Sequence, residues 1–224
     1  MSVRSVGAVV FDCDGVLVDS EPLALEVMAK ELLDLGLRLS AAEIHARFTG
    51  RSLEDCERQI AGLVGPERMA GFAGRFERRL DAVFANRLRP VPGAPGVLEA
   101  LRTAGIPVAV ASSGSHSKIG RSLSLTGLAG FFPPDRVFSA ADVPSGKPAP
   151  DLFLHAARSL EVDPGQCLAV EDSTPGLAAA DAAGMRVVAL VRPGTPPVTV
   201  PAGAEVIDGL AALAARISFF ESPG

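Results

Sequence analysis

No apolar run in the sequence approaches the roughly 20 residues that a membrane-spanning helix needs. Residues 1–15 also reach Asp12 before the apolar core of a signal peptide could be completed. Basic residues are in deficit, with 21 Lys and Arg against 26 Asp and Glu, so the net charge gives no attraction to nucleic acid or to an anionic membrane. We therefore expect a soluble cytoplasmic protein that has neither of these partners, and we expect it to be a monomer.

Cysteine is scarce as well. The three cysteines, Cys13, Cys56 and Cys167, lie far apart, and none belongs to a CxxC pair. This pattern indicates neither a disulfide framework nor a structural zinc site, and it fits a reducing compartment. Cys13 lies between two aspartates, whose charges raise a thiol pKa, so we expect it to be a packing residue rather than a nucleophile.

Short apolar runs rich in β-branched residues alternate with helical patterns, which is typical of a parallel sheet covered by helices on both faces. The predicted strands are residues 6–11, 106–111, 167–171 and 186–191. The predicted helices between them are residues 95–104, 115–125, 151–160 and 175–183, with Thr174 as the N-cap of the last. The sequence therefore predicts a Rossmann-like α/β core.

One long segment, between Asp19 and Arg89, shows no strand pattern. It contains helical stretches only, and Ser40 with Glu43 has the spacing of a capping box. The predicted helices are residues 21–35, 41–48, 53–63 and 66–88. We expect an inserted all-helical domain over residues 18–90, and an α/β core formed by residues 1–17 and 91–224.

Polar residues follow the predicted strands at the edge where parallel α/β sheets bind ligands. Such residues are found after the first strand, after the second and after the third, and a lysine occurs in the loop "PSGKPAP". They are Asp12, Asp14, Ser112, Ser113, Glu171, Asp172 and Lys147. If the strands are neighbours, these groups converge on one site.

Several carboxylates in one cleft repel each other unless a cation neutralises them. Oxygen ligands without a nearby histidine favour Mg²⁺, which shares its coordination shell with water and substrate phosphate. Together with a lysine and a serine hydroxyl, the ion makes a receptor for a phosphoryl group. One carboxylate can then attack phosphorus, and a second can protonate the leaving oxygen and later activate water.

Four motifs in this order resemble those of the haloacid dehalogenase superfamily. The motifs are "FDCDGVLVDSE", "VAVASSGS", "SGKPAPD" and "VEDS". The helical insertion is similar to the small helical cap of the β-phosphoglucomutase-like branch of that family. The resemblance implies the roles that follow. Asp12 is the nucleophile, Asp14 the acid/base, Ser112, Ser113 and Lys147 bind the phosphoryl group, and Mg²⁺ is held by Asp12, Asp14, Glu171 and Asp172.

Within this family, Asp14 favours transfer from a phosphate ester, because an alkoxide leaving group needs a proton and a halide does not. A β-phosphoglucomutase is the alternative. Ala24 and Leu53 occupy the positions where those mutases carry a histidine and an arginine. These differences favour a phosphatase, although Arg51 could grip a second phosphate instead.

The residues 47–52, "RFTGRS", form a loop in the insertion that is expected to select the substrate, with Arg51 binding the end of the substrate far from its phosphate. The chain resembles phosphatases of sugar phosphates and sugar-acid phosphates, including the 6-phosphogluconate type. We therefore predict a magnesium-dependent phosphoric monoester hydrolase acting on a small phosphorylated metabolite. A non-catalytic sensor of such metabolites is a further alternative, but a sensor has no need of a nucleophile.

Overall fold

The computed structural model describes residues 6–49, 51, 53–195 and 197–220. The chain forms two compact units. One consists of Met1–Asp19 with Arg89–Gly224, and the other is Ser20–Leu88. No helix in the described ranges has the length and apolar character needed to cross a bilayer.

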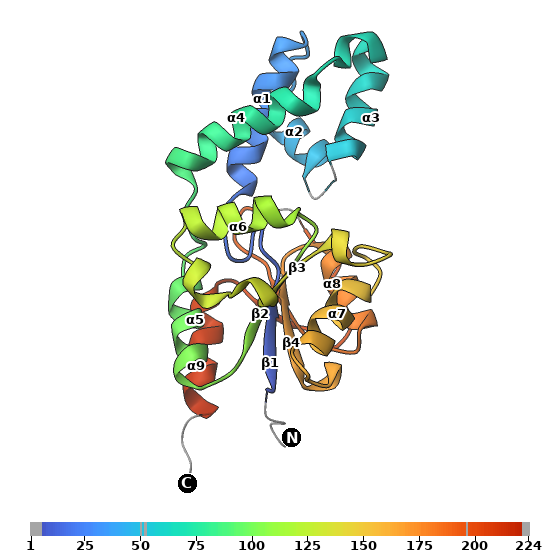
Figure 1. Cartoon of the computed structure of the whole chain (residues 1–224). Coiled ribbons are helices and arrows are strands. Elements are labelled where there is room, and N and C mark those ends of the chain that lie inside the picture. Colours follow the sequence, from blue (N-terminus) through green and yellow to red (C-terminus); the bar gives the residue numbers. More distant parts are fainter. Residues whose placement is uncertain (1–5, 50, 52, 196, 221–224) are drawn as a thin grey trace. The chain divides into compact units, whose positions relative to one another are not determined.

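Within the described residues, the first unit contains one parallel sheet of six strands in the order β3-β2-β1-β4-β5-β6 (Figure 1). The strands are β1 (Ala8–Phe11), β2 (Val108–Ser112), β3 (Val137–Ser139), β4 (Cys167–Glu171), β5 (Arg186–Leu190) and β6 (Glu205–Ile207). The strand β1 is central, and its Phe11 pairs with Val110 of β2 and Val170 of β4. The predicted α/β fold with a parallel sheet is confirmed.

Helices cover both faces of this sheet, so β1 and β4 are buried along their whole length. The helices are α5 (Ala94–Thr103), α6 (His116–Leu125), α7 (Asp151–Ser159), α8 (Thr174–Ala182) and α9 (Leu210–Phe220), and the 3₁₀ helices are η2 (Ala129–Phe131), η3 (Pro134–Arg136), η4 (Ala140–Asp142) and η5 (Pro164–Gln166). Alternate strand residues such as Ala8 and Val10 pack against α7 and α8. The helices α5 and α9 contact each other on the opposite face (Figure 1).

The edge strands β3 and β6 were not predicted. Each has three residues, which is too short to show the alternation or apolar run that identifies a strand. The predicted N-cap of α8 is also wrong by one residue. The Ser173 side chain, rather than that of Thr174, accepts the hydrogen bond from the Gly176 backbone N–H.

The second unit is helical throughout its described residues. It consists of α1 (Glu21–Asp34), α2 (Ala41–Phe48), α3 (Leu53–Val64), η1 (Pro66–Met69) and α4 (Phe72–Arg87). The capping box predicted for α2 is present, with Ser40 and Glu43 exchanging backbone and side-chain hydrogen bonds. The single helix predicted over residues 66–88 is instead interrupted, because Gly71 adopts the left-handed region at φ 69°.

A buried carboxylate joins α1 to α4. Glu31 is fully buried within the apolar core of the helical unit, and its oxygens lie 2.7 Å from Arg79 Nη1 and 3.3 Å from Arg75 Nε. Both arginine side chains are about one third exposed, so their charges remain partly solvated. The two ion pairs of Glu31 therefore fix the contact between α1, which is acidic, and α4, which is basic.

Replacing Glu31 with alanine should destabilise the protein by about 2 kcal/mol, because truncation leaves two arginines without their buried partner and opens a cavity. The matched control is Glu26→Ala on the same helix, where the exposed pair with Arg87 should contribute little. The measurement is urea unfolding followed by circular dichroism, since the chain has neither Trp nor Tyr. Equal midpoints for the two variants would contradict the role of Glu31.

Candidate active site

The predicted site residues at the ends of β1, β2 and β4 lie at one edge of the sheet. Ser112 and Glu171 are the last residues of β2 and β4, and Asp12 directly follows β1. The Asp12 backbone N–H donates to the Val170 carbonyl at 2.9 Å, which extends the pairing of β1 with β4 by one residue. The three strands are neighbours, so their terminal side chains meet where parallel sheets bind ligands.

Lys147 connects these strand ends. Its Nζ donates to Asp12 Oδ1 at 2.5 Å, to Glu171 Oε1 at 2.6 Å and to the Ala111 carbonyl at 2.9 Å. The lysine side chain is only 4% exposed and lies over the Phe153 ring. Burial alone would lower the pKa of Lys147, but the charges of Asp12 and Glu171 raise it, so the group is an ammonium.

Asp12 is buried so deeply that the charge of Lys147 does not offset the loss of hydration. Burial raises the pKa of Asp12 to about 7, with Lys147 acting in the opposite direction and the charges of Glu171 and Asp14 adding to the rise. The carboxylate is 7% exposed, so water screens it little. A further cation would favour its ionised, nucleophilic form.

Asp14 makes a different ion pair. Its Oδ2 accepts a hydrogen bond from Lys118 Nζ at 2.7 Å, and both side chains are partly exposed. Burial would lower the pKa of Lys118, but the charge of Asp14 contributes most to raising it. Sequence reasoning missed Lys118. Its position in the first turn of the helix after Ser112 is the one signal that could have suggested it.

The loop after β2 carries the two predicted phosphate-binding serines. Ser112 is buried, and its Oγ accepts from the Gly114 backbone N–H at 3.2 Å, whereas Ser113 is exposed. The edge strand β3 holds this loop, because Ser139 Oγ donates to the Gly114 carbonyl at 2.7 Å. The Ser112 hydroxyl therefore has a fixed place beside the strand ends.

Glu171 is fully buried and both of its oxygens accept hydrogen bonds. Oε1 accepts from Lys147, and Oε2 accepts from the backbone N–H groups of Asp172 and Ser173 and from Ser173 Oγ, at 2.8 to 2.9 Å. Glu171 thus shapes the loop that presents Asp172. This geometry supports Asp172 more strongly than Glu171 as a metal ligand.

Asp172 lies against the loop that carries the two aspartates of β1. A Cβ added to Gly15 would stand 1.9 Å from Asp172 Oδ2, which places this carboxylate in direct contact with the Gly15 backbone. Gly15 also has φ 86°, a conformation that favours glycine. The first and fourth motifs are therefore in contact.

Arg51 belongs to the helical unit, where it is exposed between α2 and α3. The neighbouring loop residues Gly50 and Ser52 lie outside the described residues. The role of Arg51 in substrate selection remains a prediction.

The described ranges contain no group of three His, Cys, Asp or Glu side chains that could hold a metal ion. Glu171 is paired with Lys147 and Asp14 with Lys118. Mg²⁺ needs only one or two protein carboxylates when substrate phosphate and water complete its shell. The buried carboxylate of Asp12 and the Asp172 carboxylate beside Gly15 are oxygen ligands of the kind that this ion prefers.

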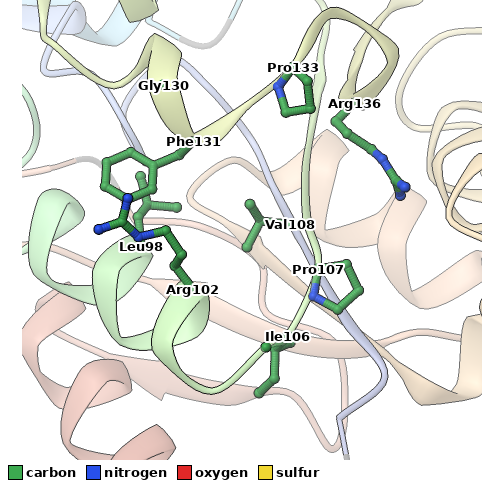
Figure 2. Close-up of a pocket in the computed structure, with 10 residues that line it drawn as sticks. Leu98, Arg102, Ile106, Pro107, Val108, Gly130, Phe131, Pro133 and Arg136 are labelled. Atoms are coloured by element: carbon green, nitrogen blue, oxygen red, sulfur yellow. The ribbon is translucent and has the colours of Figure 1, made fainter.

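A cavity of about 430 Å³ lies at the other end of β2, away from these carboxylates (Figure 2). Its lining includes Ile106, Pro107 and Val108, which lead into β2. Arg102, also in its wall, is paired with Glu99 at 2.7 Å and lies over the Phe131 ring. The cavity contains none of the predicted site residues.

The chain is similar to several known proteins. Residues 6–184 match the haloacid dehalogenase-like hydrolase family. The chain is 31% identical over 187 residues to the 6-phosphogluconate phosphatase of Escherichia coli, covering 81% of each chain. It is 32% identical over 191 residues to hexitol phosphatase A of the same organism, covering 84% of each chain.

A solved structure is also similar. It is a HAD family hydrolase from Deinococcus radiodurans with bound phosphate and sodium, at a TM-score of 0.80 and 32% identity over 95% of each chain. The phosphatase relatives confirm the predicted enzyme class. Four motifs in order, their contact at one sheet edge and the match over residues 6–184 lead to one conclusion: the chain belongs to the haloacid dehalogenase-like hydrolase family.

Proposed function

We propose that the protein is a magnesium-dependent phosphatase that hydrolyses a small sugar phosphate or sugar-acid phosphate through an aspartyl-phosphate on Asp12. The observation that carries this proposal is the buried Lys147 ammonium, which binds Asp12 Oδ1 at the edge where β1, β2 and β4 end. Asp14, two residues away, is held separately by Lys118 and is more exposed. The Asp12 carboxylate is thus held in a buried position, and the Asp14 carboxylate lies nearer to solvent.

The first step transfers the phosphoryl group. Asp12 Oδ1 is held by Lys147, so Oδ2 is the oxygen that attacks phosphorus. The bond between phosphorus and the ester oxygen breaks, and that oxygen takes a proton from the Asp14 carboxylic acid. The products are the alcohol, the aspartyl-phosphate on Asp12 and an ionised Asp14.

The second step returns the enzyme to its starting state. Asp14, now a carboxylate, takes a proton from a water molecule as the water oxygen bonds to phosphorus. The bond between phosphorus and Asp12 Oδ2 breaks, which releases inorganic phosphate and restores the carboxylate. Asp14 regains the proton that it gave up.

The remaining groups bind the phosphoryl oxygens. Lys147 offers a positive charge, and Ser112 and Ser113 offer hydroxyl and backbone donors from the loop after β2. Asp12, Asp172 and the Asp14 backbone carbonyl would hold Mg²⁺, with Glu171 shaping that loop. The ion, when bound, supplies positive charge that neutralises the carboxylates and the phosphate.

The substrate class follows from the relatives, which act on 6-phosphogluconate and hexitol phosphates according to their names. Such substrates carry hydroxyl or carboxylate groups far from the phosphate. We propose that the helical unit acts as a cap over the core and that Arg51 binds those groups.

The Asp12→Asn variant should lose phosphate release from 4-nitrophenyl phosphate by at least about 10³-fold, because the amide is not a nucleophile. Circular dichroism would show that the variant is folded. The control is Asp135→Asn in η3, an exposed aspartate that should leave activity unchanged. Activity surviving in Asp12→Asn would remove the aspartyl-phosphate from the mechanism.

The Asp172→Asn variant should raise the Mg²⁺ concentration for half-maximal activity by at least about tenfold, because a ligand is weakened. Glu171→Gln should instead lower activity at saturating Mg²⁺, since Glu171 holds Lys147 and the loop. Titration of the chelator-treated enzyme with Mg²⁺ gives both the concentration for half-maximal activity and the activity at saturation. The opposite pattern in the two variants would make Glu171 the principal ligand.

The Arg51→Ala variant should lower kcat/KM for 6-phosphogluconate by about tenfold, because a charge-assisted contact is lost. Activity on 4-nitrophenyl phosphate should not change, and Arg38→Ala is the control in the same unit. Both variants are compared with the natural protein on a panel of substrates that also includes sorbitol 6-phosphate, phosphoglycolate and β-glucose 1-phosphate. Formation of glucose 6-phosphate from β-glucose 1-phosphate would indicate a mutase instead. If Arg51→Ala leaves the ranking of the substrates by kcat/KM unchanged, Arg51 does not determine specificity.

A further inference from the structure

The Lys118 ammonium is the second cation of the active site, and the four motifs do not include it. The chain has three lysines, of which Lys30 belongs to the helical unit and Lys147 is buried beside Asp12. Lys118 Nζ lies 2.7 Å from Asp14 Oδ2, and its side chain is 43% exposed. Each of the two catalytic aspartates therefore has its own lysine.

The start of α6 determines where this ammonium lies. Ser115 caps the helix, and its Oγ accepts from the Lys118 backbone N–H at 3.4 Å. The Lys118 stem passes beside Gly114, because a Cβ added there would meet Lys118 Cδ at 3.5 Å and Ser112 Oγ at 3.6 Å. The lysine thus runs alongside the serine that ends β2.

Further contacts hold this loop in place. Ser139 of β3 donates to the Gly114 carbonyl at 2.7 Å, and His116 Nε2 lies 2.8 Å from Asp142 Oδ1. An ordinary surface ion pair is weak because both side chains move freely. Here the loop that leads to Lys118 is held by β3 and η4, so the backbone from which the lysine extends has a fixed place.

We propose that Lys118 is a positioning residue for Asp14, because its ammonium binds Oδ2 and orients the carboxyl group that gives a proton to the ester oxygen and later takes one from water. This inference rests on the proposed function. The contact is compatible with both forms of Asp14. An acid with its proton on Oδ1 keeps a carbonyl oxygen at Oδ2, which still accepts from the ammonium.

The two lysines then have parallel roles, because each binds one oxygen of one aspartate. Lys147 binds Oδ1 of Asp12, whose Oδ2 attacks phosphorus, and Lys118 binds Oδ2 of Asp14, whose carboxyl group exchanges the proton. Without Lys118 the Asp14 carboxylate loses the contact that orients it toward the ester oxygen. The loss should then appear where the leaving group needs a proton, as alkoxides do and 4-nitrophenolate does not.

The test compares Lys118→Met with the natural protein on 4-nitrophenyl phosphate and on the alkyl phosphate of the panel with the highest kcat/KM. The quantity compared is kcat/KM, which includes the step that releases the leaving group and excludes the later hydrolysis of the aspartyl-phosphate. We expect it to fall about 10- to 100-fold for the alkyl ester and less than about threefold for the aryl ester. Lys118→Arg should recover part of the loss, and Lys30→Met, which also removes a lysine paired with an aspartate, should change neither value.

A double-mutant cycle separates positioning from direct substrate binding. In an Asp14→Asn background, Lys118→Met should cost little further kcat/KM on the alkyl ester, because both changes disable the same proton transfer. Independent, additive losses would overturn the proposal and make Lys118 a substrate-binding residue. Equal losses on both ester types in Lys118→Met would also overturn it. An active Asp12→Asn enzyme would overturn the proposed function itself, so the two failures are distinguishable.

Discussion

The active site depends on one buried ammonium group. Lys147 reaches the ends of β1, β2 and β4 from a loop, and it neutralises carboxylates that would otherwise repel each other in a water-poor environment. A buried ammonium is itself costly, so it is stable only because Asp12 and Glu171 lie within hydrogen-bond distance. Burial raises the pKa of Asp12 to about 7 in spite of Lys147, and the charges of Glu171 and Asp14 add to the rise. A divalent cation at this edge would favour the ionised form of Asp12.

The sequence predicted this convergence because a parallel sheet brings the ends of distant strands to the same edge. Asp12 and Lys147 are 135 positions apart, yet the order β2-β1-β4 makes their meeting a consequence of topology. The strands β1, β2, β4 and β5 were predicted because burial on both faces requires continuous apolar runs. The edge strands β3 and β6 lack such runs. The strand β3 nevertheless supports the candidate site, because Ser139 holds the loop after Ser112.

Side-chain partners were harder to predict than backbone positions. The motif in "VEDS" gives two acids after β4, but only the three-dimensional contacts show that Glu171 is engaged by Lys147 and by its own loop. Lys118 shows the same difficulty, since an exposed lysine in the first turn of a helix looks like an ordinary surface residue. Two predicted helix boundaries were wrong for local reasons. Ser173 and Thr174 are both good N-caps, so the sequence did not decide where α8 begins. The left-handed backbone of Gly71, which precedes α4, is not revealed by composition alone.

Glycine completes the site for reasons that packing makes clear. Gly15 combines a positive φ with contact against Asp172, so a side chain there would displace a carboxylate proposed to hold the metal. Gly176 plays the equivalent part for Glu171, because an added Cβ would stand 1.7 Å from Oε1. Two glycines thus let carboxylates approach the backbone, Gly15 in the loop after β1 and Gly176 in the first turn of α8. The missing Cβ atoms therefore allow Asp172 and Glu171 to lie against backbone at the same edge of the sheet as Asp12.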